Sequence, residues 1–337
     1  MDVLLLFALI LSLMLIGVPI AVSLGLSSII FLLLTSDDTL AGIAQTLFSA
    51  VAEHYTLLAI PFFILASSFM STGGVARRII DFSIASVGHL RGGLAISGVF
   101  ACMMFAALSG SSPATVVAIG SIAIAAMIRA GYSKDFAAGV ICNAGTLGIL
   151  IPPSIVMVVY ASAVDVSVGR MFLAGVVPGV LAGLMLMVAI YVMAWRRGIP
   201  TQPFAGFGAV WRSFRSAFWG LMLIVVIFIG IYGPGPLLTP FKALVGWWSG
   251  TVPDWRGGAL FTPTEAAAVA AVYAFFVANF LYRDMGPLKN TPLRREGQSR
   301  LGAVLSWPVD AVVYALPALT HRDTRRVLYE AGKLTAT

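Results

Sequence analysis

The sequence predicts an all-α protein that crosses a membrane several times. Hydrophobic residues make up 59% of its 337 residues and charged residues 10%, whereas soluble domains contain about 25% charged residues. Mean hydropathy is +0.97. A helix crosses a bilayer in about 20 residues, and uncharged runs of at least this length recur along the chain. The basic residues behind the net charge of +7 stand in short blocks between these runs. That arrangement indicates membrane topology rather than nucleic-acid binding.

The first uncharged run covers residues 3–36 and is divided by Gly17, Val18 and Pro19. As one helix it would be about 50 Å long, too long for a hydrocarbon layer about 30 Å thick. We therefore expect two short crossings with a bend at residues 17–19. No basic block precedes the run and no small-residue cleavage site is evident, so we expect a retained membrane segment rather than a signal peptide.

The next segment is expected to be a loop outside the cytoplasm, because Asp37, Asp38 and Glu53 occur in it without any Lys or Arg. A span over residues 55–71 then returns the chain to the cytoplasm. After it, apolar residues recur on one side of a helix, which predicts an amphipathic helix lying along the membrane surface. These residues are Val75, Ile79, Ile80, Phe82, Ile84 and Val87.

A helical hairpin is predicted over residues 92–129. The run has no charge before Arg129 and is interrupted near its middle by Ser109, Gly110, Ser111, Ser112 and Pro113. It is too long for one span and suits two legs, so the interruption should be a hairpin tip. Basic residues flank the hairpin and place both its ends on the cytoplasmic side. They are Arg91, Arg129 and Lys134.

A broken helix is predicted over residues 136–164, with the break at residues 143–153. The break contains Asn143, Gly145, Thr146, Gly148, Pro152 and Pro153. Non-helical backbone at membrane depth survives only where protein or a polar cavity surrounds it, and transporters use such interruptions to bind ions and anions. The simpler interpretation is a pair of kinked structural helices, since Gly and Pro are common in membrane spans.

Further spans are expected over residues 171–195, 217–232 and 261–282, and they leave most of the 21 Lys and Arg residues on one side. Between the last two, residues 233–258 are rich in Gly, Pro and Trp, and Trp247, Trp248 and Trp255 suit a membrane interface. The runs at Pro19 and Pro263 suggest an internal repeat. We accordingly divide the chain into a first repeat (1–216), the start of a second (217–284) and an irregular, charged C-terminal segment (285–337).

Several motifs resemble the large membrane subunit of tripartite ATP-independent periplasmic (TRAP) transporters. They are residues 60–66 (IPFFILA), 109–119 (SGSSPATVVAI), 129–132 (RAGY), 143–154 (NAGTLGILIPPS), 261–268 (FTPTEAAA) and 325–335 (RRVLYEAGKLT). The resemblance implies an inverted-repeat secondary transporter with a re-entrant hairpin. In that family each half has its own hairpin and broken helix, whereas no second pair follows Glu265 here, so the second repeat is expected to be incomplete.

The two interruptions are the candidate binding site. Hydroxyl and carbonyl oxygens suit a sodium ion, for which we expect Ser111, Ser112, Asn143, Gly145 and Thr146 as ligands, and donors at the tip suit a substrate carboxylate. Ser109, Gly110 and Gly148 are expected to complete one wall of the substrate pocket. Pro113, Pro152 and Pro153 would keep the breaks open, because proline lacks a backbone N–H. The alternative is that the hydroxyls bond back to helix carbonyls, as is common in membrane helices.

Other titratable residues carry weaker signals. Glu265 begins an apolar helix, where it either caps the helix next to Thr264 or couples protons. Cys102 and Cys142 lie in apolar runs and predict neither a disulfide nor a metal site. His54, His89 and His321 lie in or beside polar loops, and no zinc pair, phosphate loop or serine-hydrolase elbow is present. An enzyme is therefore not expected, and a channel is disfavoured because the spans are polar only at the breaks.

The resemblance implies the large permease subunit of a sodium-driven importer in the bacterial inner membrane, without a cofactor. Its expected substrate is a C4-dicarboxylate, a sugar acid or a keto acid. Its expected partners are a small four-span membrane subunit and a periplasmic substrate-binding protein. Two alternatives remain open: a sodium:dicarboxylate symporter that needs no binding protein, and a truncated remnant that does not transport.

Overall fold

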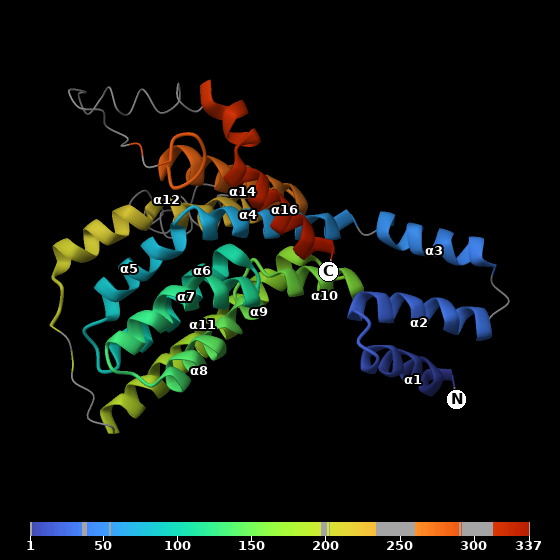
Figure 1. Cartoon of the computed structure of the whole chain (residues 1–337), viewed down its shortest axis with the longest axis horizontal. Helices are drawn as coiled ribbons and strands as arrows, with labels where there is room; N and C mark the ends of the chain where they lie inside the picture. The colour runs from blue at the N-terminus through green and yellow to red at the C-terminus, as the bar shows by residue number, and fades with distance from the viewer. Residues whose placement is uncertain are drawn as a thin grey trace, which may run out of the picture.

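The computed structural model describes residues 2–35, 39–53, 55–196, 201, 203–233, 260–289, 291 and 313–336. Within these residues the regular structure is helical, as predicted (Figure 1). Five of the described helices are long and apolar enough to cross a membrane, or six if one bent pair counts as a span. The Trp-containing stretch, Asp37, Asp38, His54 and residues 292–312 lie outside the described residues.

The first uncharged run forms two helices, as predicted. α1 (Asp2–Leu15) and α2 (Ile20–Thr35) pack against each other, and Gly17 between them has a φ of 91°. The segment after them was wrongly expected to be a loop up to Glu53, because α3 (Leu40–Glu53) occupies it. Of the acidic residues that suggested a loop, Asp37 and Asp38 precede Thr39, whereas Glu53 is the last residue of α3. The Thr39 hydroxyl accepts a hydrogen bond from the Gly42 N–H (3.2 Å) and so caps the helix.

Two helices from distant parts of the sequence pack against each other. A short 3₁₀ turn (Tyr55–Leu58) leads into α4 (Ala59–Thr72), and α14 (Pro263–Phe276) continues as a π-helix, η2 (Val277–Leu281). The rings of Phe69 and Phe275 lie edge to face with centroids 5.5 Å apart. The contact face of α14 consists of small side chains, which allow close approach of the backbones. These are Ala266, Ala267, Ala270, Ala271 and Ala274, all buried.

Part of the C-terminal segment expected to be irregular is helical. Residues 313–320 are helical, and α16 (Arg322–Ala336) packs on α4. Thr324, Val327 and Ala331 are buried and lie on one side of the helix. Charge density suggested irregular structure, but the apolar residues follow the helical period and bury one face.

α5 (Val75–Val87) is the predicted amphipathic helix, and it packs between α6 (Gly93–Ser109) and α12 (Phe207–Tyr232). That it lies along a membrane surface stays a prediction. α12 starts well before the expected residue 217, so Arg212 and Arg215 lie on a helix and not in a loop. Because arginine is a good helix former, a basic block need not end the helix that contains it.

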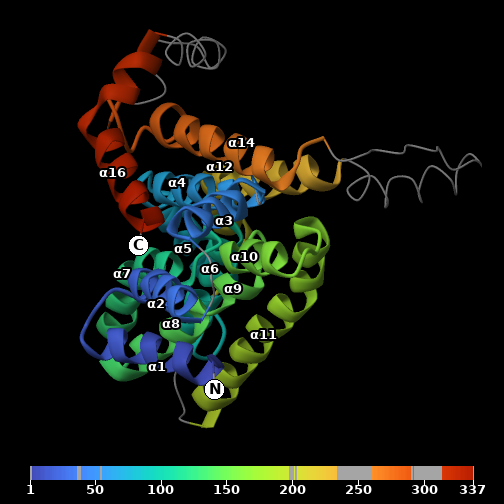
Figure 2. The same ribbon diagram turned by 90° about the vertical axis from the view of Figure 1, so that its right-hand side faces the viewer.

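Of the helices described so far, α4, α12, α14 and α16 form one layer, and α6 with the helices that directly follow it forms another (Figures 1 and 2). α7 (Ser112–Arg129), α8 (Lys134–Gly145), α9 (Leu147–Leu150), α10 (Ile155–Ala163) and α11 (Val168–Arg196) follow α6 in the sequence. In both views, α6 to α11 lie below α4, α12, α14 and α16 (Figures 1 and 2).

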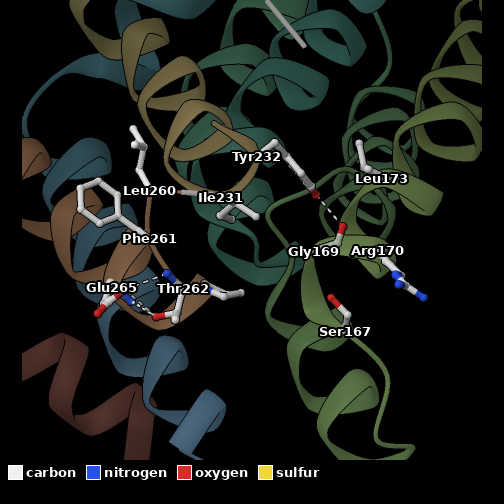
Figure 3. A pocket seen from close by; sticks show the side chains of 11 residues that line it. Ser167, Gly169, Arg170, Leu173, Ile231, Tyr232, Leu260, Phe261, Thr262 and Glu265 are labelled. Atoms are coloured by element: carbon white, nitrogen blue, oxygen red, sulfur yellow. Dashed lines mark hydrogen bonds between the residues drawn. The ribbon is translucent and has the colours of Figure 1, made fainter. Parts of the chain in front are cut away.

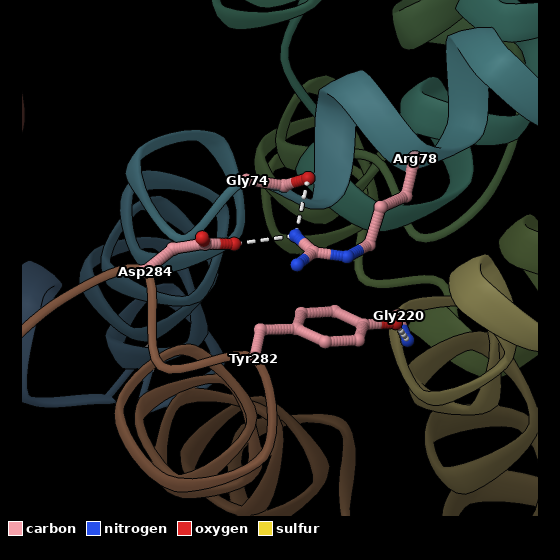
Figure 4. Close-up of polar contacts among 5 residues, drawn as sticks. All are labelled: Gly74, Arg78, Gly220, Tyr282 and Asp284. Carbon is pink, nitrogen blue, oxygen red and sulfur yellow. Dashed lines mark hydrogen bonds and ion pairs between the residues drawn. The ribbon is translucent and has the colours of Figure 1, made fainter. Parts of the chain in front are cut away.

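A polar cluster joins three helical segments at the end of α14. The Arg78 guanidinium forms an ion pair with Asp284 and donates a hydrogen bond to the Gly74 carbonyl (3.0 Å) (Figure 4). It also lies 4.0 Å from the centroid of the Tyr282 ring. The Tyr282 hydroxyl in turn accepts a hydrogen bond from the Gly220 N–H of α12 (2.9 Å).

We expect Asp284→Asn to lower the free energy of unfolding by about 1 to 3 kcal/mol, because a charge-assisted hydrogen bond in a partly buried site is lost. The matched control is Glu330→Gln, which removes the ion pair between Arg326 and Glu330 on α16. That pair is exposed, so its loss should cost less than about 0.5 kcal/mol. Thermal unfolding in detergent measures both variants, and equal melting temperatures would contradict a structural role for the cluster.

Candidate functional site

The turn between α6 and α7 is the hairpin tip that the sequence predicts. α6 ends at Ser109, Gly110 has a left-handed conformation (φ 61°), and Ser111 is extended before α7 begins at Ser112. Glycine suits the positive φ because it has no Cβ. Pro113 lies in the first turn of α7, where a missing N–H leaves no helical hydrogen bond unmade.

Hydroxyl groups within the tip fix its shape. The hydroxyls of Ser109 and Thr115 lie 2.8 Å apart within hydrogen-bond distance, and the Thr115 hydroxyl donates to the Ser111 carbonyl (2.9 Å). The Thr115 N–H donates to the same carbonyl (3.0 Å). Ser109 and Thr115 are fully buried, so these two hydroxyls have a structural role. Thr115 did not stand out in the sequence, since an isolated Thr in an apolar helix is common.

The predicted broken helix is interrupted, but over fewer residues than expected. Residues 134–150 and 155–163 are bent by 42° at residues 151–154, whereas Asn143 and Gly145 belong to α8. The Asn143 amide donates to the Gly139 carbonyl (2.8 Å), and the Thr146 hydroxyl donates to the Asn143 carbonyl (2.7 Å). These side chains bond to backbone carbonyls of α8, which ends at Gly145. After a turn at Thr146, α9 carries the helical path on to Leu150, and the larger bend follows at the prolines, which cannot donate.

The two interruptions meet in space. The Ile155 N–H at the start of α10 donates to the Gly110 carbonyl at the hairpin tip (3.0 Å). A Cβ placed on Gly110 would lie 2.6 Å from the Pro153 carbonyl oxygen, and one on Gly148 would lie 3.0 Å from the Ser112 nitrogen. Each glycine therefore allows backbone to approach backbone where the breaks touch.

Two serine hydroxyls at this junction have no partner within the described structure. The Oγ atoms of Ser112 and Ser154 are buried and make no hydrogen bond, and Ser154 is fully buried. Buried polar atoms are usually paired, so an unpaired hydroxyl indicates a missing ligand or water. The carbonyls of Ile151, Pro152 and Pro153 also lie outside any helix. Uncharged oxygens of this kind suit a hard cation.

α11 supports the junction from the opposite side. A Cβ on Gly175 would lie 2.6 Å from the Leu150 carbonyl oxygen, and one on Gly179 would lie 2.7 Å from Ile151 Cγ1. Gly183 continues the four-residue spacing and lies against Met103 of α6. We did not single out these glycines in the sequence, although small residues four apart are a recognisable signal for close helix packing in membranes.

The junction thus brings together most of the predicted site residues. Asn143, near the end of α8, and Thr146, in the turn between α8 and α9, are exposed, and their sodium role stays a prediction. The residues that contact one another across the two breaks, or flank those that do, are Ser109, Gly110, Ser111, Ser112, Pro113, Gly145, Gly148, Pro152 and Pro153.

Comparison with known families agrees with this architecture. Residues 7–306 match the family described as "Tripartite ATP-independent periplasmic transporter, DctM component". The chain belongs to this family. With five or six apolar spans among its described residues, this DctM family member is a multi-pass membrane protein.

Similar proteins are transporter permeases and not enzymes. The chain is 60% identical over 335 residues to the C4-dicarboxylate TRAP transporter large permease protein DctM of Vibrio cholerae, covering 99% of this chain and 65% of that protein. The protein of the same name from Pseudomonas aeruginosa is 59% identical over 78% of this chain and 56% of its own length. The 2,3-diketo-L-gulonate TRAP transporter large permease protein of Escherichia coli is 38% identical over 80% of this chain and 57% of its own length. The chain thus spans somewhat over half the length of these DctM relatives.

Glu265 lies in the first turn of α14. Its carboxylate accepts a hydrogen bond from the Thr262 N–H (2.8 Å), and its own N–H donates to the Thr262 hydroxyl (3.3 Å), which completes a capping box. The cap residue is therefore Thr262 and not Thr264 as expected. Glu265 lines a pocket of about 510 Å³ between α11, α12 and α14 (Figure 3). Tyr232 and Gly169 also line this pocket, and the Tyr232 hydroxyl donates a hydrogen bond to the Gly169 carbonyl (2.6 Å).

We expect Glu265→Gln to leave transport and its pH dependence unchanged, because glutamine also completes a capping box. Thr262→Ala, which removes the cap hydroxyl, should instead lower stability by about 1 kcal/mol. Uptake measured between pH 5.5 and 8.5, together with melting temperature, separates the two roles. A stable Glu265→Gln variant whose uptake no longer responds to pH would show that the carboxylate couples protons.

Proposed function

We propose that this DctM family chain is the permease part of a secondary transporter that imports an organic acid together with sodium. The relatives support an acidic substrate, because the permeases are named for C4-dicarboxylate, 2,3-diketo-L-gulonate and, in Haemophilus influenzae, sialic acid. All three ligands carry carboxylate groups. The sodium ion is a co-transported substrate and not a resident cofactor.

The observation that carries the proposal is the junction of the two breaks. The Gly110 carbonyl accepts the Ile155 N–H, and the unpaired hydroxyls of Ser112 and Ser154 lie at the two helix starts beside it. A cation bound by these hydroxyls and by carbonyls of residues 151–153 would join the hairpin to the broken helix. Sodium binding would thus stabilise the arrangement of the backbone that meets the acid.

The same junction supports binding of a carboxylate. α7 and α10 both begin there, and their N-cap residues, Ser111 and Ser154, make no side-chain capping hydrogen bond. The first N–H groups of a helix have no partner within it and carry a partial positive charge. Apart from the Ile155 N–H, which already donates to Gly110, these two helix N-termini therefore offer donors to an anion, and a sodium ion beside them would add positive charge.

The proposed setting is the bacterial inner membrane. We infer a re-entrant hairpin over α6 and α7, in the first of two inverted repeats, with residues 217–284 beginning the second. The partners we propose are a small four-span membrane subunit and a periplasmic substrate-binding protein. The relatives' description as large permeases of tripartite transporters supports two such partners, and the four spans of the small subunit are part of the proposal.

Reconstitution of the complete transporter in proteoliposomes tests this function. We expect saturable uptake of a C4-dicarboxylate only with an inward sodium gradient, the small subunit and the loaded binding protein. Full uptake without the binding protein would favour an independent symporter instead. Ohmic current without saturation would indicate a channel, and uptake that ignores the sodium gradient would contradict sodium coupling.

A further inference from the structure

We propose that the first half of α12 binds the headgroup of an anionic phospholipid through Arg212 and Arg215. Both side chains are exposed and lie three residues apart, so they project from neighbouring positions on one side of the helix. α12 contains no acidic residue along its length. The two guanidinium groups therefore form a positive surface suited to a phosphate group.

Neither arginine has an acidic partner in the described structure. Asp81 of α5 is a candidate partner, because the Phe82 ring next to it in the sequence packs 5.6 Å from the Phe214 ring of α12. Within the described residues, however, no ion pair joins Asp81 to Arg212 or Arg215. Arg78, also on α5, differs because Asp284 neutralises it. Among the described residues, therefore, no acidic side chain neutralises Arg212 or Arg215, and their positive charge is available to a ligand.

Exposed aromatic side chains place this part of α12 at the boundary between lipid and water. Phe207 is 85%, Trp211 66% and Trp219 44% exposed. Tryptophan is enriched where a membrane protein passes from hydrocarbon to headgroups, because its ring is apolar and its N–H polar. After Trp219 the helix becomes uniformly apolar up to Tyr232. Arg212 and Arg215 thus lie at headgroup level. The acyl chains of a bound lipid can lie along the apolar second half of α12, after Trp219.

A lipid fits this surface better than a soluble anion. Figure 1 places the start of α12 on the left side, where α11 ends at Arg196 and where the turn from α7 to α8 carries Arg129 and Lys134. Basic residues mark the cytoplasmic side of a membrane protein, and the cytoplasmic leaflet supplies anionic headgroups. The aromatic side chains around the arginines would contact glycerol and acyl groups, which a free phosphate lacks.

The test compares lipids and variants on the purified chain in detergent. Short-chain phosphatidylglycerol should bind at least about tenfold more tightly than phosphatidylcholine of the same chain length. In Arg212→Gln/Arg215→Gln, affinity for phosphatidylglycerol should fall about 25-fold, since each interfacial arginine contributes roughly a factor of five. Phosphatidylcholine affinity should not change. The matched control is Arg170→Gln, an exposed arginine at the opposite end of α11, which should leave both affinities unaltered.

Several outcomes would overturn the proposal. Equal affinity for the two lipids would show that no anionic headgroup is recognised. Undiminished phosphatidylglycerol binding by the double variant, at a melting temperature equal to wild type, would place the lipid elsewhere. Glycerol phosphate binding as tightly as phosphatidylglycerol would assign the arginines to a soluble anion. The small subunit could instead displace the lipid, and the double variant could fail to assemble with that subunit. Both results together would assign this surface to protein contact.

Discussion

Gly148→Ala is expected to reduce sodium-driven uptake at least about tenfold. An added Cβ would lie 3.0 Å from the Ser111 carbonyl carbon and 3.0 Å from the Ser112 nitrogen. Both atoms belong to the backbone of the hairpin tip, which cannot rotate away as a side chain can. The tip must move away from the broken helix, and the protein groups proposed to bind the sodium ion and the substrate carboxylate then separate. Overpacking of this kind costs typically 1 to 3 kcal/mol, and one kcal/mol at a binding site is about fivefold in affinity.

Gly139→Ala is the matched control for this substitution. Gly139 lies on α8, and an added Cβ meets nothing within 4 Å. Alanine in a helix is favoured over glycine by about 1 kcal/mol, so this variant should transport normally and melt at the same or a higher temperature. Uptake into proteoliposomes is normalised to the amount of inserted protein. Wild-type uptake by Gly148→Ala would show that the contact between the breaks is not needed for transport.

Ser112→Ala/Ser154→Ala is expected to weaken sodium binding without weakening the fold. Each lost hydroxyl ligand should raise the sodium concentration for half-maximal uptake about tenfold, which corresponds to about 1.4 kcal/mol. Because both hydroxyls are buried without a partner, their removal relieves a desolvation cost. The melting temperature in sodium-free buffer should therefore stay equal or rise.

The combination of weaker sodium activation and undiminished stability distinguishes a binding role from a structural one. Thr115→Ala offers the contrast, because the Thr115 hydroxyl bonds to Ser111 and its loss should lower the melting temperature. Ser121→Ala is the neutral control, since its hydroxyl bonds to the Ala118 carbonyl of its own helix. Unchanged sodium activation in the Ser112→Ala/Ser154→Ala variant would remove these hydroxyls from the site.

The hairpin and the broken helix could be predicted because their signals are local. Gly110 and Pro113 interrupt an uncharged run that is too long for one span, and Pro152 with Pro153 removes two adjacent donors. The extent of the second break was harder to predict from the sequence. Asn143 looked like part of it, yet its amide completes a hydrogen bond to Gly139 within α8. Whether a polar side chain ends a helix or bonds back into it depends on the surrounding packing.

Other features depend on contacts between segments far apart in the sequence. Ser154 follows the prolines and carries no signal of its own, and its burial in the fold beside the contact of Ile155 with the hairpin tip is not visible in the sequence. Gly175 and Gly179 matter because Leu150 and Ile151 lie against them. The extension of α12 back to Phe207 was missed because the expected span began at residue 217, after the basic residues Arg212 and Arg215. A basic block at a membrane boundary indicates topology, and it does not indicate where a helix begins.

Disulfide formation between α7 and α8 tests the central claim that the two interrupted segments lie together. A Cβ on Gly145 would lie 3.5 Å from the Val116 Cβ, within the range of disulfides. In a background lacking Cys102 and Cys142, Val116→Cys/Gly145→Cys should cross-link on mild oxidation in membranes, whereas Val116→Cys/Gly139→Cys should not. Absence of the first cross-link, or equal cross-linking of both pairs, would contradict the junction on which the proposed binding site depends.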